Sequence, residues 1–170
     1  MIKKFINKLL GKSTPGTSGG KPHFGKREEV PASVHGINPE LVDRRAADVV
    51  ATLKQAGFEA YIVGGAVRDL LLGLRPKDFD IATNATPEQV KRLFRRAFII
   101  GRRFQIVHVM FGQDLLEVTT FRGAAKTESP TDEHGRVLRD NTFGEQHEDA
   151  ARRDFTINAI AKGEDGTLVD

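Results

Sequence analysis

Apolar and polar residues first form a regular pattern at Asn-Pro-Glu, residues 38–40, which is typical of the start of a helix. Apolar side chains then recur every three or four positions until Gly57. Residues 58–63 are rich in β-forming side chains and end at two glycines, after which residues 66–72 predict a short helix. The pattern therefore predicts that the glycine pair joins a strand to the N-terminus of a helix.

The middle of the chain continues to alternate between strand and helix patterns. Residues 78–83 predict a second strand, and Thr-Pro-Glu-Gln at 86–89 predicts a capping box that opens another helix. Residues 105–111 and 115–121 alternate across a tight turn, which predicts a β-hairpin. Together these elements predict an α+β fold in which helices flank a mixed or antiparallel sheet.

The last third of the chain is less regular. Residues 123–147 are polar and have no sustained period, and a loop of this length in a compact domain is usually functional or mobile. Residues 148–161 predict a helix, and residues 167–170 resemble a strand that has only begun. We therefore expect a flexible loop and a chain that is cut short.

The first 37 residues differ in composition from the rest. Residues 1–30 carry seven basic side chains against two acids, so the remainder has a net charge of about −2 although the whole chain has +3. The opening twelve residues suit an amphipathic helix on an anionic lipid surface or on RNA, or else a solvated disordered leader. Glycine, serine and proline then dominate to about residue 31. We expect a basic leader and linker over residues 1–37 and one folded domain over 38–170.

Composition excludes several kinds of chemistry and placement. The chain has no cysteine, which rules out disulfides, thiolate zinc sites and a cysteine nucleophile. It has no apolar run near the roughly 18 residues that a membrane span needs, and its start lacks the features of a secretory signal. We therefore expect a cytoplasmic protein, with association to a membrane surface through the leader left open.

The sharpest local motif is Asp78-Phe79-Asp80. In a strand, residues i and i+2 point to the same face roughly 6.6 Å apart, so two carboxylates can converge on hard cations. Two such acids repel each other unless a divalent ion compensates, and that ion can clamp the oxygens of a phosphoryl transfer. Taken alone, most such motifs are solvated surface acids, but here apolar neighbours surround the pair.

A third acid, Glu117, lies among apolar and β-branched residues on one face of its predicted strand. Such a position is unusual for a charge unless a metal or a partner receives it, although an edge-strand charge facing water is the equal alternative. His108, in the partner strand of the hairpin, fits a plain half-exposed histidine better than a ligand, because no other ligand is spaced to join it.

Two further groups suit phosphate. Gly64 and Gly65 offer unobstructed backbone N–H groups at a helix start, with Arg68 one turn later, although an ordinary strand-to-helix turn would look the same. Arg153 could reach phosphate and Asp154 could accept a hydrogen bond from a ribose hydroxyl. An exposed charge cluster is the plainer alternative for that pair.

A basic stretch follows the capping box and is interleaved with phenylalanines, which more often serve the core than stack on bases. RNA backbone is its plausible partner. The candidate RNA-binding residues are Arg95, Arg96, Arg102 and Arg103.

The segments YIVGGAVRDLLLGLRPKDFDIATNATPEQV, EVTTFR and RRDFTINAIA together resemble the class II nucleotidyltransferases of the polymerase β superfamily, which are bacterial poly(A) polymerases and CCA-adding enzymes. The resemblance runs from about residue 41 to residue 170. It implies a polymerase β-like nucleotidyltransferase head domain over 38–170 that is truncated at its C-terminus relative to the family.

The resemblance also implies roles for the residues named above. Asp78 and Asp80 would bind two Mg²⁺ ions, with Glu117 as the third carboxylate, and Asp154 would join the two aspartates in carrying the reaction. The implied nucleotide-binding residues are Gly64, Gly65, Arg68, Arg153 and Asp154.

The segments FIIGRRFQIVHVMFG and LRDNTFG are more similar to poly(A) polymerases than to CCA-adding enzymes. This resemblance implies transfer of AMP from ATP to an RNA 3′ end. A CCA-adding enzyme, which also uses CTP and acts on tRNA ends, is the first alternative. A non-catalytic RNA-binding or membrane-surface module is the second. The base-selecting residues of the family have no counterpart here, so base choice stays open.

Overall fold

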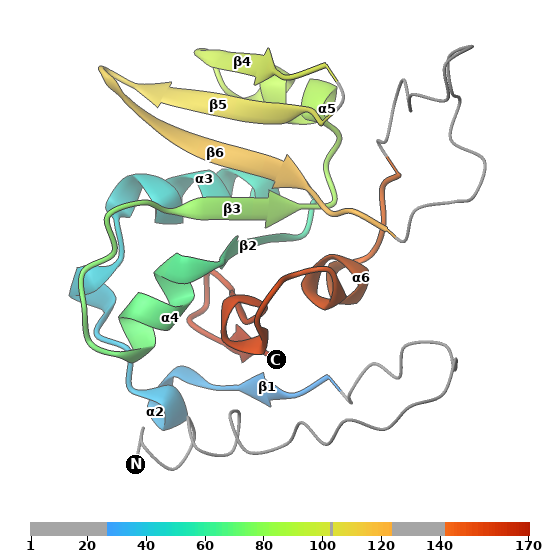
Figure 1. Cartoon of the computed structure of the whole chain (residues 1–170). Helices are drawn as coiled ribbons and strands as arrows, with labels where there is room; N and C mark the ends of the chain where they lie inside the picture. The colour runs from blue at the N-terminus through green and yellow to red at the C-terminus, as the bar shows by residue number, and fades with distance from the viewer. Residues whose placement is uncertain (1–26, 103, 124–141) are drawn as a thin grey trace, which may run out of the picture.

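The computed structural model describes residues 27–102, 104–123 and 142–170. Within these ranges eight strands form one mixed sheet in the order β1-β8-β7-β2-β3-β6-β5-β4 (Figure 1). β3 and β6 run parallel, and every other neighbouring pair is antiparallel. The strands are β1 Glu29–Val30, β2 Ala60–Val63, β3 Asp80–Thr83, β4 Ala97–Ile100, β5 Ile106–Phe111, β6 Asp114–Thr120, β7 Ala161–Lys162 and β8 Leu168–Val169.

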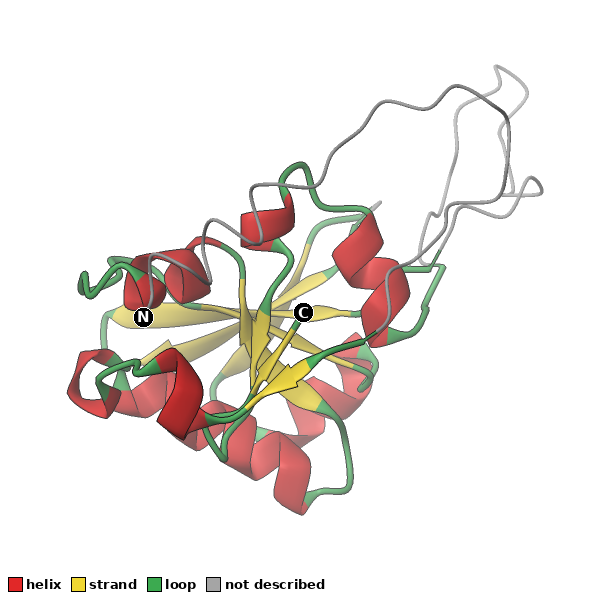
Figure 2. Cartoon of the chain, turned by 90° about the horizontal axis from the view of Figure 1, so that it is seen from below, coloured by secondary structure: helices red, strands yellow, loops and turns green. Residues whose placement is uncertain are grey.

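Helices and loops surround these strands (Figure 2). The α-helices are α2 Ala32–His35, α3 Arg44–Gln55, α4 Gly65–Leu71, α5 Pro87–Leu93 and α6 Gln146–Ala151, and the 3₁₀ helices are η1 Pro39–Leu41 and η2 Thr156–Asn158. The α+β prediction is confirmed. None of the helices in the described ranges is long and apolar enough to span a membrane.

The folded unit begins earlier than residue 38, so the predicted boundary after residue 37 is wrong. β1 pairs with β8, and Val30 is buried opposite Leu168. The buried His35 holds α2 in place: its Nε2 lies 2.6 Å from the carbonyl oxygen of Gly166, and its Nδ1 accepts from the N–H of Ile37 at 3.0 Å. A carbonyl only accepts and an N–H only donates, so the ring is neutral with its proton on Nε2.

The helix predicted from residue 38 to Gly57 is divided in two. Asn38 caps the 3₁₀ helix η1 by accepting from the N–H of Glu40 at 3.0 Å, and the chain then becomes extended at Val42. Asp43 caps α3 in the same way, by accepting from the N–H of Arg45 at 2.8 Å. Of the apolar face predicted for this helix, Ala46, Val49, Val50 and Leu53 are buried in α3, whereas Val42 lies before α3 and is half-buried.

The central elements follow the prediction closely. α4 begins directly after β2, and Gly64 between them has φ +74° and ψ −148°. The capping box of α5 is complete, because Thr86 and Gln89 each accept from the other's backbone N–H. The hairpin of β5 and β6 turns at Gly112, which has φ +66°.

The predicted helix over residues 148–161 is wrong in extent. α6 ends at Ala151, and a turn, η2 and β7 follow. The side chain of Asp154 accepts from the N–H of Phe155 at 2.9 Å, so it takes a backbone donor that a continued helix would use. The predicted strand at the C-terminus is confirmed as β8. The expectations for residues 1–26, for Arg103 and for most of the loop lie outside the described residues.

The sheet has two unlike faces over β3, β6, β5 and β4. One face packs in the main core with α3 and α5, and the strand residues on that covered face include Ile81, Val118, Val107 and Ala97. We call the other side, which carries Asp80, Glu117, His108 and Phe98, the open face; on β3 only its Asp80 end is exposed, because Ala82 on the same side is buried in a second apolar cluster. Phe98 on this face is 53% exposed.

Candidate active site

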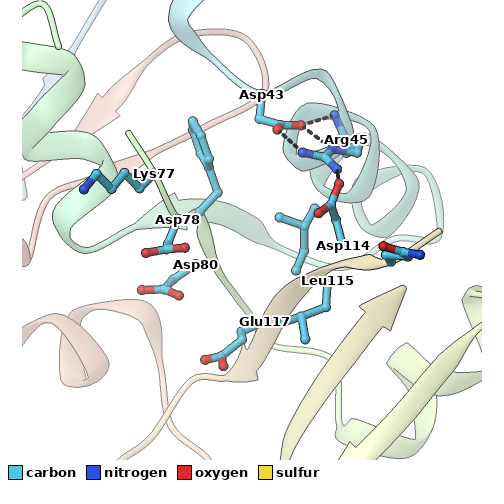
Figure 3. A pocket seen from close by; sticks show the side chains of 11 residues that line it. Asp43, Arg45, Lys77, Asp78, Asp80, Asp114, Leu115 and Glu117 are labelled. Atoms are coloured by element: carbon cyan, nitrogen blue, oxygen red, sulfur yellow. Dashed lines mark hydrogen bonds and ion pairs between the residues drawn. The ribbon is translucent and has the colours of Figure 1, made fainter. Parts of the chain in front are cut away.

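The two motif aspartates lie at the start of β3. Phe79 between them is buried in the main core. Asp80 is the first residue of the strand, whereas Asp78 lies just before it rather than within it. Figure 3 shows the two carboxylates on the same side of the chain, as the alternation predicts. The structure therefore brings Asp78 and Asp80 to one side of the chain as predicted, although β3 begins at Asp80 and not at Asp78 (Figure 3).

Glu117 joins them from the neighbouring strand. β6 runs parallel to β3 in a register that places Glu117 directly opposite Asp80. All three acids line one hollow of about 580 Å³ (Figure 3). Among the residues that the structure describes, no three His, Cys, Asp or Glu side chains form a closed metal-binding cluster. The three carboxylates thus border a shared opening, with Asp78 and Asp80 as the close pair.

The electrostatics of Asp80 indicate that negative charge predominates around its carboxylate, although Arg45 and Lys77 also line the hollow. Burial of the carboxylate raises the pKa of Asp80 above its ordinary value, and the nearby negative charges of Glu117 and Asp78 raise this pKa further. Arg153 acts in the opposite direction. Asp80 is exposed as a whole residue, and its carboxylate lies near the like charges of Glu117 and Asp78. Hard oxygen donors with excess negative charge fit a divalent cation such as Mg²⁺.

An ion-pair network forms another wall of the same hollow. Arg45 contacts Asp43 through two nitrogens, at 2.7 and 3.0 Å, and contacts Asp114 at 2.6 Å (Figure 3). The hydrogen bond from Arg45 lowers the pKa of Asp43 below its ordinary value. This network ties the N-terminus of α3 to the turn of the β5–β6 hairpin.

Gly64 brings the strand-to-helix turn against the acids. A Cβ atom at this position would lie 3.4 Å from Oδ2 of Asp80 and 3.5 Å from Nη1 of Arg153. Arg153 is held in place by Asp149, whose Oδ2 lies 3.2 Å from Nη2. The backbone of Gly64, the carboxylate of Asp80 and the guanidinium of Arg153 therefore meet, although they come from three separate segments.

Arg68 and Asp154 lie around the N-terminus of α4. Arg68 donates to Asp69 through two nitrogens, and a Cβ atom on Gly65 would lie 3.2 Å from its Nη2. The Nη1 of Arg68 also lies 3.4 Å from Oδ1 of Asn158, whose amide nitrogen lies 3.4 Å from Asp154. Arg68, Asn158 and Asp154 are thus linked, and Asp154 is exposed.

The predicted RNA-binding arginines lie apart from the acids. Arg95 and Arg96 precede β4 and Arg102 follows it, which is three strands along the sheet from β3. All three are exposed, and among the described residues none of them is paired with an acid.

Two residues of the site escaped the sequence prediction. Asp149 orients Arg153, and Asn158 links Arg68 to Asp154. His108 faces Glu117 across the hairpin, with its Nε2 3.5 Å from Oε1. His108 is half-buried, as the sequence predicted, but the strands predicted over 105–111 and 115–121 would have placed it opposite Val118 and not Glu117.

Residues 60–170 match the protein family described as "Poly A polymerase head domain". The chain belongs to this family. It is similar to poly(A) polymerase I of Salmonella typhimurium (strain LT2), with 46% identity over 94% of the chain and 35% of that protein. It is also similar to the CCA-adding enzyme of Lactobacillus helveticus, with 46% identity over 74% of the chain and 31% of that enzyme.

Among solved structures, the head-domain fold is similar to that of the Bacillus stearothermophilus CCA-adding enzyme in complex with CTP. The TM-score is 0.59 at 41% identity, and the match covers 78% of this chain and 30% of that one. The chain spans about a third of the length of the relatives that it matches.

Proposed function

We propose that the chain is the catalytic head of an enzyme that transfers AMP from ATP to the 3′ end of RNA, as in polyadenylation. The observation that carries this proposal is the meeting of Asp80, Gly64 and Arg153 beside Asp78. It supplies a pair of carboxylates for divalent cations and, next to them, a backbone turn and a guanidinium for phosphate. Family membership gives the reaction class, because the relatives are named as poly(A) polymerase I and CCA-adding enzymes.

In this proposal Asp78 and Asp80 hold two Mg²⁺ ions, with Glu117 as the third carboxylate. The ions would lower the pKa of the attacking 3′-hydroxyl and neutralise charge on the departing pyrophosphate. The residues of the chain then have separate tasks. Gly64, Gly65 and Arg68 receive the triphosphate, while Arg153, oriented by Asp149, faces the charge that develops on it.

The bonds change in a single displacement. The 3′-hydroxyl oxygen of the RNA forms a bond to the α-phosphorus of ATP as the bond to the β-phosphate oxygen breaks, and pyrophosphate leaves. The hydroxyl proton passes to a carboxylate, for which Asp80 and Glu117 are the candidates. Asp154, which is exposed beside Asn158, is placed to accept a hydrogen bond from the ribose.

The poly(A) assignment is preferred because the similarity to poly(A) polymerase I extends over 94% of the chain, compared with 74% for the CCA-adding enzyme. The CCA-adding function is the second candidate, since a CCA-adding enzyme in complex with CTP shares the fold at 41% identity. ATP and an RNA 3′ end are the proposed partners. Contact of the basic leader with RNA or a membrane remains a prediction.

The test is primer extension by the intact protein with single nucleotides. An unstructured RNA oligomer and a tRNA that lacks its CCA end serve as primers, in the presence of Mg²⁺. The proposal predicts long A ladders on the oligomer and little use of CTP. Ready incorporation of CTP that stops at the completed tRNA end would instead assign the chain to the CCA-adding enzymes.

A further inference from the structure

The register of the sheet lines up one residue from each of five neighbouring strands. From β2 to β4 this row runs Val63, Asp80, Glu117, His108 and Phe98. It therefore leads from the catalytic carboxylates, through an imidazole, to an aromatic ring on the last strand of the sheet.

The outer part of this row is open. Phe98 is 53% exposed, and Ile100 and Leu115 on the same face are 48% and 43% exposed. The residues that alternate with them on these strands, such as Val107, are buried on the covered face. Folding of the head domain alone therefore does not explain why a phenylalanine occupies position 98, since its ring is not part of the core.

The in-line geometry of the displacement indicates which reactant binds over the open face. Gly64 and Arg153, which are proposed to bind phosphate, meet Asp80 at the end of β2. In phosphoryl transfer the attacking and leaving oxygens lie roughly in line across the phosphorus. If pyrophosphate leaves on the β2 side, the attacking hydroxyl arrives from the opposite side, across β6 and β5. The open face is therefore on the side of the RNA primer.

We propose that the open face over β6, β5 and β4 binds the last nucleotides of a single-stranded RNA 3′ end, with one base stacked on Phe98. This inference rests on the proposed function. Three strand spacings of roughly 4.8 Å put Phe98 about 14 Å from Asp80. This is the reach of a few nucleotides at about 3.4 Å each. Phe98 would thus stack on a base a few positions before the reacting 3′-hydroxyl.

The charges near Phe98 complement such a strand. Arg95, Arg96 and Arg102 lie at the two ends of β4, exposed and without an acidic partner among the described residues. Guanidinium groups beside an exposed aromatic ring are typical of surfaces that hold single-stranded nucleic acid, where bases stack and phosphates pair. An apolar protein segment would explain the exposed ring of Phe98. It would explain neither the arginines at the ends of β4 nor the row of residues that leads from Phe98 to the carboxylates.

The experiment compares Phe98→Leu with Phe98→Tyr in the intact protein. Leucine keeps an apolar contact but cannot stack, whereas tyrosine keeps the stack. Phe143→Leu is the matched control, because Phe143 is also an exposed phenylalanine, at 48%, and pairs with Arg122 outside the row. RNA oligomers with 2-aminopurine at each of the last five positions in turn report stacking as a loss of fluorescence. The KM for RNA and the KM for ATP are measured in parallel.

The proposal predicts that Phe98→Leu raises the KM for RNA about fivefold or more, the smallest loss expected from one base–aromatic stack, and leaves the KM for ATP unchanged. It also predicts quenching at one internal position that Phe98→Leu abolishes and that Phe98→Tyr and Phe143→Leu retain. If Phe98→Leu still adds nucleotides and has the KM for RNA and the quenching of the wild type, the proposal is wrong.

Two other outcomes are separable from this one. If Phe98→Tyr lowers the unfolding midpoint while Phe98→Leu behaves like wild type, a protein segment covers the face and the proposal is wrong. If the wild-type protein adds no nucleotide to any RNA, the proposed function fails. The fluorescence readout still decides the inference in that case, because it measures binding without turnover.

Discussion

Replacing Gly64 with alanine perturbs the backbone turn on which the proposed phosphate site depends. At φ +74° and ψ −148° this residue occupies a region that is almost exclusive to glycine, and a side chain there costs about 1–3 kcal/mol. The added methyl group would lie 3.4 Å from Asp80 and 3.5 Å from Arg153, which is ordinary contact. The loss of stability therefore comes from the backbone rather than from a clash.

This cost can be converted into a shift of the unfolding midpoint. In a protein of this size about 1 kcal/mol corresponds to roughly 2–4 °C, so Gly64→Ala should lower the midpoint by roughly 2–12 °C. Turnover should fall by more than stability explains, because the methyl group occupies the space between the carboxylate and the guanidinium. We expect a loss of about tenfold or more in the rate of AMP transfer, measured well below the midpoint.

Gly73→Ala is the matched control for this experiment. Gly73 has a similar φ of +72°, but nothing lies within 4 Å of the position of its Cβ atom. This variant should lose stability and keep the turnover of the wild type. If Gly64→Ala retained turnover within twofold of Gly73→Ala, the turn at Gly64 could not be part of the phosphate site.

Three further outcomes follow from individual contacts. Asp149→Ala should raise the KM for ATP and lower turnover by about tenfold, because Arg153 loses the carboxylate that lies 3.2 Å away. The control Arg45→Ala, in the ion-pair network of the hollow, should affect the KM for ATP less. Equal effects of the two substitutions on the KM for ATP would contradict a specific role for Asp149. Asp43→Asn keeps the helix cap but removes the charge that is paired with Arg45. Because the pKa of Asp43 is lowered in the folded state, the variant should be less stable than the wild type by up to about 1 kcal/mol at pH 7. This difference in stability should vanish as the pH falls through the lowered pKa. Removing residues 1–37 should lower the unfolding midpoint further than removing residues 1–26 does, because β1 and the buried His35 lie within residues 27–37. Equal midpoints for the two truncations would show that this segment contributes nothing.

Long or strongly patterned elements were predictable from the sequence, and short ones were not. The hairpin, the capping box of α5 and the strand–glycine–helix turn each have several local signals that agree. β1 has two residues and β7 has two, which is too short for an alternating pattern to stand out from polar surroundings. β1 pairs with β8 near the other end of the described chain, and β7 pairs Lys162 with the distant Ile62 as well as with the nearby β8, so local sequence could not reveal the long-range pairings.

The same distinction holds for the site. Asp78 and Asp80 were predictable because their i, i+2 spacing puts both carboxylates on one side of the chain (Figure 3). Glu117 was suggested by its apolar surroundings, but the parallel register that places it opposite Asp80 had no signal in the local sequence. His108 was expected to be a half-exposed histidine, and it is, but its place opposite Glu117 depends on a two-residue turn that the predicted hairpin did not have. Asp149 and Asn158 gave no signal, because their roles arise when α6 and η2 fold against α4 and the end of β6.

The central claim is that Asp78 and Asp80 hold the metal ions of nucleotidyl transfer, and it is tested by the turnover of Asp78→Ala and Asp80→Ala in the intact protein. Asp48→Ala, which removes an exposed acid from α3, is the control. AMP transfer to an RNA oligomer is followed across a Mg²⁺ titration, alongside the thermal unfolding midpoint. We expect each active-site variant to lose turnover by at least about a thousandfold at every Mg²⁺ concentration, with a midpoint no lower than that of the wild type, because each change removes a repelling charge without emptying the core. Turnover within a few-fold of the wild type in either variant would contradict the account.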